Sequence, residues 1–225
     1  MDLQLCGRTA LITGGSKGIG KVIARELAQE GMDLVICART MATLESTANE
    51  LSGETERKIL PIKADMTSGA DVQRMVKIAV AEFGKIDVLV NNAAMVGGQV
   101  AAHLADATEI DLTEDLDTKV VGYFRTIKAV APYMQKQRWG RIINIGGLSA
   151  RQSSLYGLRN SAIVHMSKTL SDQLGSFGIT VNTVHPGATL TDGIEQRLRE
   201  RADSRGMTLE ALERESSHFV AIQRM

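Results

Sequence analysis

The chain reads Leu11-Ile12-Thr13-Gly14-Gly15-Ser16-Lys17-Gly18-Ile19-Gly20, and this stretch decides the fold. Its apolar start is typical of a strand, and the residues after Gly20 resume at once with helical spacing. Glycines permit a tight turn and let backbone N–H groups approach a pyrophosphate, whose charge is favoured at the start of a helix. The stretch therefore predicts a phosphate-binding turn between the first strand and the first helix.

Short β-rich runs alternate with longer helical patterns along the rest of the chain. The runs typical of strands are 9–13, 33–38, 57–62, 86–90, 140–145 and 178–184. The segments typical of helices are 19–30, 41–51, 69–83, 109–136 and 154–175, and the charged stretch 192–217 predicts solvated helices. We therefore expect an α/β fold, a Rossmann-type doubly wound parallel sheet in three α/β/α layers, with ligands at the carboxyl ends of the strands.

Composition limits the class of protein. A chain of 225 residues with 44% hydrophobic residues fits one α/β domain over 1–225. Twenty-six basic and twenty-six acidic residues leave no formal net charge, which argues against a nucleic-acid partner or a polybasic membrane patch. No stretch approaches the roughly 18 apolar residues of a membrane span. The four histidines lack metal-ligand spacing, so we expect no metal.

The two cysteines bear on the compartment. Cys6 and Cys37 cannot form a disulfide framework, and Cys37 lies in an apolar run where a buried neutral thiol is the ordinary interpretation. We therefore expect a cytoplasmic protein.

A second interpretation of the glycine turn is a triphosphate-binding loop. Residues 15–21 fit the first seven places of that motif, but the eighth place is Val22 and not the Ser or Thr that would ligate magnesium. The dinucleotide interpretation is therefore favoured.

Several segments agree in order and spacing with one enzyme family. They are the turn 13–20, Asp65 after the third strand, Asn91-Asn92-Ala93-Ala94, Tyr156 near the start of a long helix, and the Pro186-Gly187 turn. Together they resemble the short-chain dehydrogenases/reductases, nearly from end to end of the chain. The resemblance implies that the protein binds a nicotinamide dinucleotide. It places cofactor-binding roles on Gly14, Ser16, Lys17, Gly18, Ile19, Gly20, Asp65, Met66, Asn91, Ala93, Tyr156, Pro186, Gly187, Thr189 and Thr191.

The choice between NAD and NADP follows from charge. An acidic residue about 20 positions past the glycines would bind the 2′-hydroxyl of NAD, whereas an arginine there accommodates the 2′-phosphate of NADP. This chain has Arg39 just after the second strand and Lys17 in the turn. Two cations without a competing carboxylate predict NADP(H) as the cofactor.

The catalytic positions depart from those of the family. The resemblance implies a tyrosine that exchanges a proton with the substrate, and Tyr156 is in place. The family's serine position is Gly147, its lysine position is Asn160, and its helix asparagine position is Lys119. Ser149, or else Ser153 or Ser154, is the expected substitute for the missing serine.

Three interpretations of these departures stay open. In the first, the positive charge has moved, so that Lys119 reaches Tyr156 or its water from the opposite helix and carbonyl–alcohol interconversion continues. In the second, the protein binds NADP(H) as a scaffold or sensor and does not catalyse. In the third, Arg159 or water takes the place of the missing lysine. The first interpretation predicts a reductase of small carbonyl compounds.

The resemblance also implies an oligomer. Family members pair through their two long helices, here 109–136 and 154–175, so a homodimer or homotetramer is expected. Either this surface or the interior of the monomer accounts for Ala129, Ala131, Ala162, Ile163 and Met166. The family continues beyond the position of Met225 into a further helix and strand. We therefore expect either a trimmed end or an exposed edge of the sheet.

Overall fold

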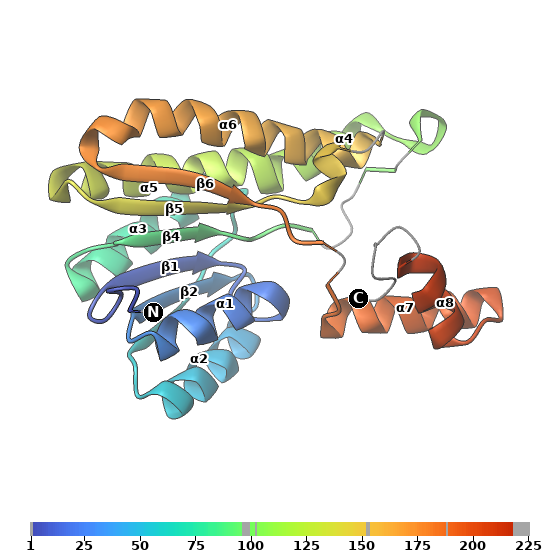
Figure 1. Ribbon diagram of the computed structural model, residues 1–225, viewed down its shortest axis with the longest axis horizontal. Helices are drawn as coiled ribbons and strands as arrows, with labels where there is room; N and C mark the ends of the chain where they lie inside the picture. Colours follow the sequence, from blue (N-terminus) through green and yellow to red (C-terminus); the bar gives the residue numbers. More distant parts are fainter. Residues whose placement is uncertain (1, 96–99, 102, 152–153, 188, 218–225) are drawn as a thin grey trace. The chain divides into compact units, whose positions relative to one another are not determined.

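The computed structural model describes residues 2–95, 100–101, 103–151, 154–187 and 189–217. Its centre is a parallel six-stranded sheet in the order β3-β2-β1-β4-β5-β6 (Figure 1). The strands are β1 (Thr9–Thr13), β2 (Asp33–Ala38), β3 (Ile59–Lys63), β4 (Val88–Asn91), β5 (Gly140–Ile145) and β6 (Ile179–Val184). The order reverses between β1 and β4, so the expected Rossmann-type sheet is confirmed, with its switch point beside the glycine turn.

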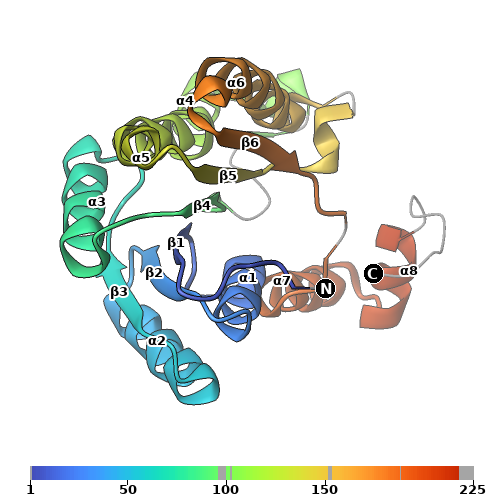
Figure 2. The same ribbon diagram turned by 60° about the vertical axis from the view of Figure 1, so that its left-hand side comes forward.

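Helices cover both faces of the sheet. The long helices are α1 (Gly18–Gln29), α2 (Met41–Thr55), α3 (Gly69–Phe83), α4 (Glu109–Leu116), α5 (Gly122–Gln137) and α6 (Leu158–Leu174). Figure 2 shows α1 and α2 on one face and α3, α5 and α6 on the other. Alternate residues of each strand point to opposite faces, so Leu11 packs under α3 and α5, whereas Ile12 packs under α1 and α2.

The predicted helix over 109–136 is confirmed as one helical segment that contains a π-helical turn. The π-helical turn η2 (Asp117–Val121) separates α4 from α5. A π turn inserts one extra residue into a helix and is common at functional sites. Here it carries Lys119, whose side chain is buried.

The apolar residues of the long helices lie mainly within the monomer. Ala129 and Ile163 are buried, and Ala131 and Met166 pack partly against the core under α3 and α5. Burial inside the monomer therefore explains these four residues. Cys37 is also fully buried, and this burial raises the pKa of its thiol to about 12, as expected of an inert core cysteine.

The chain divides into two compact units, residues 1–185 and 186–225. The first contains the whole sheet. The second contains α7 (Asp192–Arg205) and α8 (Leu209–Ser217), which pack on each other through Leu198, Ala202 and Leu212. The helices expected over 192–217 are confirmed, and the prediction of a single domain stays a prediction. Within the described residues, no helix combines the length and apolar character needed to cross a membrane.

Candidate active site

The glycine turn leaves the start of α1 open. The backbone N–H groups of Gly14 and Gly15 both donate to the carbonyl oxygen of Cys37, which ties the turn to the end of β2. Gly14 and Gly18 adopt positive φ angles of 67° and 55°, which glycine tolerates best. The N-cap residue Lys17 makes no side-chain hydrogen bond to the helix. The first N–H groups of α1 are therefore left for an anion.

Asn92 locks this turn against the end of β4. Its side-chain amide donates to the carbonyl oxygens of Thr13 (3.1 Å) and Gly14 (3.1 Å), and its backbone N–H donates to the Thr13 hydroxyl. A Cβ atom at Gly20 would lie 2.2 Å from the Gly14 oxygen and 2.5 Å from Asn92 Nδ2. The sequence indicated Asn91 and Ala93 but missed Asn92. Side chains alternate along a strand, so of two adjacent asparagines one turns toward the neighbouring loop.

The two predicted phosphate cations are both exposed at this edge of the sheet. Lys17 lies in the turn and Arg39 follows β2. An Arg39 amino group lies 4.0 Å from the sulfur of Met95, which follows β4. Because β2 and β4 flank β1 in the sheet, Arg39 reaches across the end of the strand that leads into the glycine turn.

The other predicted cofactor residues have mostly internal partners. Asp65 accepts from the backbone N–H and hydroxyl of Thr67, and the Met66 carbonyl accepts from Arg125. Asn91 is fully buried between Thr126 and Asn144, which occupy its oxygen and one of its N–H groups. The Ala93 N–H donates to the Thr13 hydroxyl. The Asn91 side chain thus joins β4 to β5 and α5 through its two hydrogen bonds.

The guanidinium of Arg159 packs on the ring of Tyr156. Tyr156 lies in a short 3-10 turn, η4 (Leu155–Gly157), and Arg159 follows in the first turn of α6. The Arg159 guanidinium carbon lies 4.4 Å from the centroid of the Tyr156 ring. Asp115 on α4 holds the guanidinium through a 2.6 Å contact, and both side chains of this ion pair are buried.

Lys119 and Asn160 contact each other. The Lys119 ammonium donates to Asn160 Oδ1 (2.8 Å) and to the Gly146 carbonyl oxygen (2.9 Å). Asn160 Nδ2 in turn donates to the Ser149 hydroxyl oxygen at 2.7 Å. Three of the four predicted catalytic residues therefore form one buried chain. Within the described residues, no hydrogen bond joins Lys119 to Tyr156.

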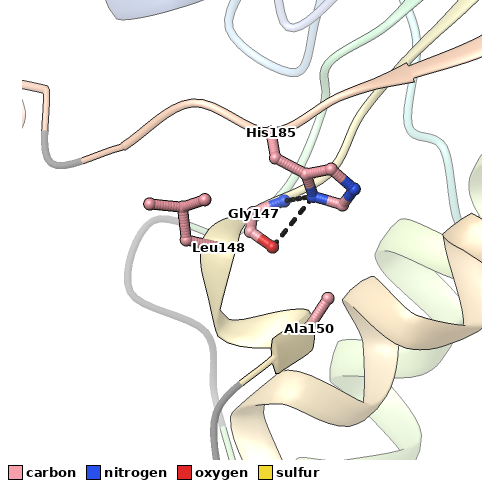
Figure 3. A pocket seen from close by; sticks show the side chains of 4 residues that line it. All are labelled: Gly147, Leu148, Ala150 and His185. Carbon is pink, nitrogen blue, oxygen red and sulfur yellow. Dashed lines mark hydrogen bonds between the residues drawn. The ribbon is translucent and has the colours of Figure 1, made fainter.

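A glycine beside this chain makes room for it. A Cβ atom at Gly147, the family's serine position, would lie 2.8 Å from Asn160 Nδ2. The backbone N–H and oxygen of Gly147 each lie 3.0 Å from His185 Nδ1, and these two residues line a small pocket with Leu148 and Ala150 (Figure 3). The His185 ring therefore fixes the backbone two residues before Ser149.

Four predicted cofactor residues belong to the second unit. Thr191 is the N-cap of α7, where its hydroxyl accepts from Ile194, and the Thr189 hydroxyl donates to the Gly187 carbonyl oxygen. Pro186 begins this unit. Their roles toward a cofactor stay predictions. Ser153 lies outside the described residues. In the described part of the chain, no three His, Cys, Asp or Glu side chains form a metal-binding group.

The buried Lys119 should make the stability of the protein depend on pH. Burial, with the nearby Arg159 guanidinium, lowers the pKa of Lys119 from 10.5 to about 7, although Asp115 opposes the shift. Above pH 7 the native state gives up this proton while the unfolded chain keeps it, so the free energy of unfolding rises with pH. The cost of burying the charge is fully present below pH 7.

The Lys119→Met variant isolates this effect. Between pH 7 and pH 9 we expect the free energy of unfolding of the wild type to rise by about 2 kcal/mol relative to the variant. Urea unfolding of both proteins at several pH values measures this difference. Parallel pH dependences would show that Lys119 keeps an ordinary pKa.

Known proteins share both the sequence and the fold. Residues 8–202 match the short chain dehydrogenase family. The chain is 32% identical over 208 residues to D-beta-hydroxybutyrate dehydrogenase of Rhizobium meliloti, covering 90% of this chain and 80% of that protein. It is 33% identical over 190 residues to 3-oxoacyl-acyl-carrier-protein reductase FabG of Staphylococcus epidermidis, covering 82% and 76%.

A solved structure agrees over the whole chain. L-sorbose reductase from Gluconobacter frateurii, complexed with NADPH and L-sorbose, superposes with a TM-score of 0.94 at 26% identity. The match covers 100% of this chain and 86% of that one. The resemblance stated from the motifs is thereby confirmed, and the chain belongs to the short-chain dehydrogenase family.

Proposed function

We propose that the protein is an NADP(H)-dependent oxidoreductase that interconverts a small carbonyl compound and its alcohol, mainly as a reductase. The observation that carries this proposal is the glycine turn. The turn is packed so closely that a Cβ atom at Gly20 would overlap the Gly14 backbone oxygen. The helix that follows has no side-chain hydrogen bond at its N-cap, so its first backbone N–H groups are left without one. This geometry suits a pyrophosphate held by backbone N–H groups. The dehydrogenase and reductases matched above support the reaction class.

The residues present fit a phosphorylated dinucleotide. Gly14, Gly18 and Gly20 would hold the pyrophosphate, and Arg39 with Lys17 would bind the 2′-phosphate. The NADPH complex of L-sorbose reductase supports this choice. When bound, the reduced dinucleotide supplies the hydride.

The protein's own residues would manage the proton and the substrate oxygen. Tyr156 carries a hydroxyl that can give its proton to the substrate oxygen during reduction. The guanidinium of Arg159 lies on the ring and always carries its charge. Ser149 supplies a second hydroxyl, fixed by Asn160. This arrangement follows the third interpretation, because Arg159 contacts Tyr156. It keeps the reaction of the first interpretation but not its contact, because Lys119 bonds to Asn160 and not to Tyr156.

Cofactor choice provides a direct test. Arg39→Ala should weaken NADPH binding about 10- to 100-fold, the loss expected for a charge-assisted contact, while NADH binding changes little. Fluorescence titration of both reduced dinucleotides measures the two dissociation constants. Lys77→Ala on α3 is the control for removing one exposed positive charge. Equal losses for NADPH and NADH would contradict the assignment of Arg39 to the 2′-phosphate.

An alternative is a protein that binds NADP(H) without turnover. One observation favours it: in the described residues the Lys119 ammonium bonds to Gly146 and Asn160 and not to Tyr156. A screen of ketones and aldehydes with NADPH, at several pH values, separates the two functions. Turnover with any of them supports the oxidoreductase, whereas tight NADPH binding without turnover supports the alternative.

A homodimer or homotetramer is part of the proposal. Phe124 on α5 and Val164 on α6 are large apolar side chains left exposed on the two helices through which family members pair. Sedimentation of the wild type and of Phe124→Glu checks this: the wild type should be an oligomer and the variant smaller. A monomeric wild type would contradict it.

A further inference from the structure

We propose that Lys119 is a positioning residue that sets the direction of the buried chain Lys119–Asn160–Ser149, so that the Ser149 proton is committed to an acceptor oxygen of the substrate. The inference deepens the proposed function and rests on it. It assigns to Ser149 a carbonyl oxygen as its ligand and gives Lys119 and Asn160 roles that act through that serine.

The direction of the hydrogen bonds between Lys119, Asn160 and Ser149 follows from the chemistry of Lys119. A lysine ammonium has three donor hydrogens and no acceptor. The atom of Asn160 that faces Lys119, 2.8 Å away, must therefore be its oxygen. The ammonium form of Lys119 therefore fixes the orientation of the amide, because it can only donate to Asn160 and to the Gly146 carbonyl oxygen. A neutral amine also has a lone pair, so the fixed direction belongs to the charged form.

The second half of the chain is then determined. With its oxygen toward Lys119, Asn160 presents its NH₂ group to Ser149 at 2.7 Å. An NH₂ group only donates, so the Ser149 hydroxyl oxygen accepts and its proton must find a partner elsewhere. No described residue accepts that proton. A buried hydroxyl proton without a partner is costly, which favours a ligand that supplies an acceptor.

The residues around Lys119, Asn160 and Ser149 fit a role in positioning the Ser149 hydroxyl. The Asp115–Arg159 ion pair joins α4, which leads directly into η2, to α6, and both members are buried. Gly147 gives the amide of Asn160 the space it needs, since a Cβ there would lie 2.8 Å from Nδ2. Ser149 lies in the turn η3 (Leu148–Arg151), directly after Gly147 and Leu148, which line the small pocket.

Asn160→Asp is the decisive variant because it reverses the second bond. The carboxylate has nearly the shape of the amide and pairs with Lys119, but it cannot donate, so Ser149 must give its proton to Asp. We expect Asn160→Asp and Ser149→Ala each to lower kcat/KM for carbonyl reduction about 100-fold, the usual loss on removing one donor to a substrate oxygen. The double variant should be no slower than Ser149→Ala alone. Additive losses would overturn the proposal.

A measurement without cofactor checks the structural step. Exchange of the Asn160 side-chain amide protons with solvent, followed by ¹⁵N NMR, should accelerate at least about ten-fold in Lys119→Met and in Ser149→Ala, because each variant removes one bond of the chain. The matched control is Ser161→Ala, next to Asn160 on α6, whose exposed hydroxyl donates to backbone oxygens outside the chain. Unchanged exchange in Lys119→Met would also overturn the proposal.

The outcomes separate the inference from the function beneath it. A wild-type protein that neither binds nor oxidises NADPH contradicts the proposed function. A protein that reduces carbonyls normally, but in which Asn160→Asp keeps full activity, contradicts only the role of Lys119 and Asn160.

Discussion

Tyr156→Phe is expected to lower carbonyl turnover by about 10²- to 10⁴-fold and to leave NADPH binding nearly unchanged. The variant removes only the hydroxyl that gives its proton to the substrate oxygen, and general acid catalysis contributes about this factor. The ring remains, so the guanidinium of Arg159 keeps its contact with it. Steady-state rates with the best carbonyl substrate, together with an NADPH titration, measure both quantities.

Tyr133→Phe on α5 is the control for this variant. Tyr133 packs partly against the core under α3 and α5, so its loss of a hydroxyl tests the general effect of a Tyr-to-Phe change. It should retain wild-type turnover. Equal turnover in Tyr156→Phe and the wild type would show that the proton comes from another group, and the proposed site would be wrong.

Gly20→Ala is expected to abolish NADPH binding, with a dissociation constant raised about 100-fold or more. The new methyl group would lie 2.2 Å from the Gly14 oxygen, which is backbone and cannot rotate away. Either the turn or the start of α1 must shift, and both form the proposed pyrophosphate site. Overpacking of this kind also costs about 1–3 kcal/mol of the free energy of unfolding.

Gly53→Ala is the matched control. Gly53 lies inside α2, and a Cβ there meets nothing within 4 Å. This variant should bind NADPH normally and gain about 0.5–1 kcal/mol in the free energy of unfolding, because alanine is the better helix former. NADPH titration and urea unfolding of both variants provide the comparison. Normal NADPH affinity in Gly20→Ala would place the dinucleotide elsewhere.

Local sequence was sufficient for the main elements of the fold. The turn from Thr13 to Gly20 needs only adjacent residues, and β1, β2 and β5 lie at the predicted positions. The third strand begins at Ile59 and not at residue 57, because the Arg57 side chain and Lys58 N–H bind Asp33 at the entrance of β2. The helix expected over 109–136 is helical throughout, and only the π turn η2 within it was not predicted, because a single inserted residue leaves the apolar period almost unchanged.

The candidate site was predictable as a set of residues but not as a set of bonds. The sequence indicated Lys119, Ser149, Tyr156 and Asn160, and its first interpretation directed Lys119 toward Tyr156 or its water. The structure instead pairs Lys119 with Asn160, a residue 41 positions away, and leaves the contact with Tyr156 to Arg159. Asn92 was missed for the same reason, since its partners Thr13 and Gly14 lie 79 and 78 positions away.

By itself the sequence determined the parallel sheet, the glycine turn and the chemical groups available at the strand ends, because hydrophobic period and backbone freedom are properties of neighbouring residues. Only the tertiary structure decided which groups meet. Hydrogen-bond partners are set by how α4, η2 and α6 pack on the sheet, and a buried donor must find an acceptor among whatever that packing brings near. The direction of the Lys119–Asn160–Ser149 chain is therefore a property of the folded protein.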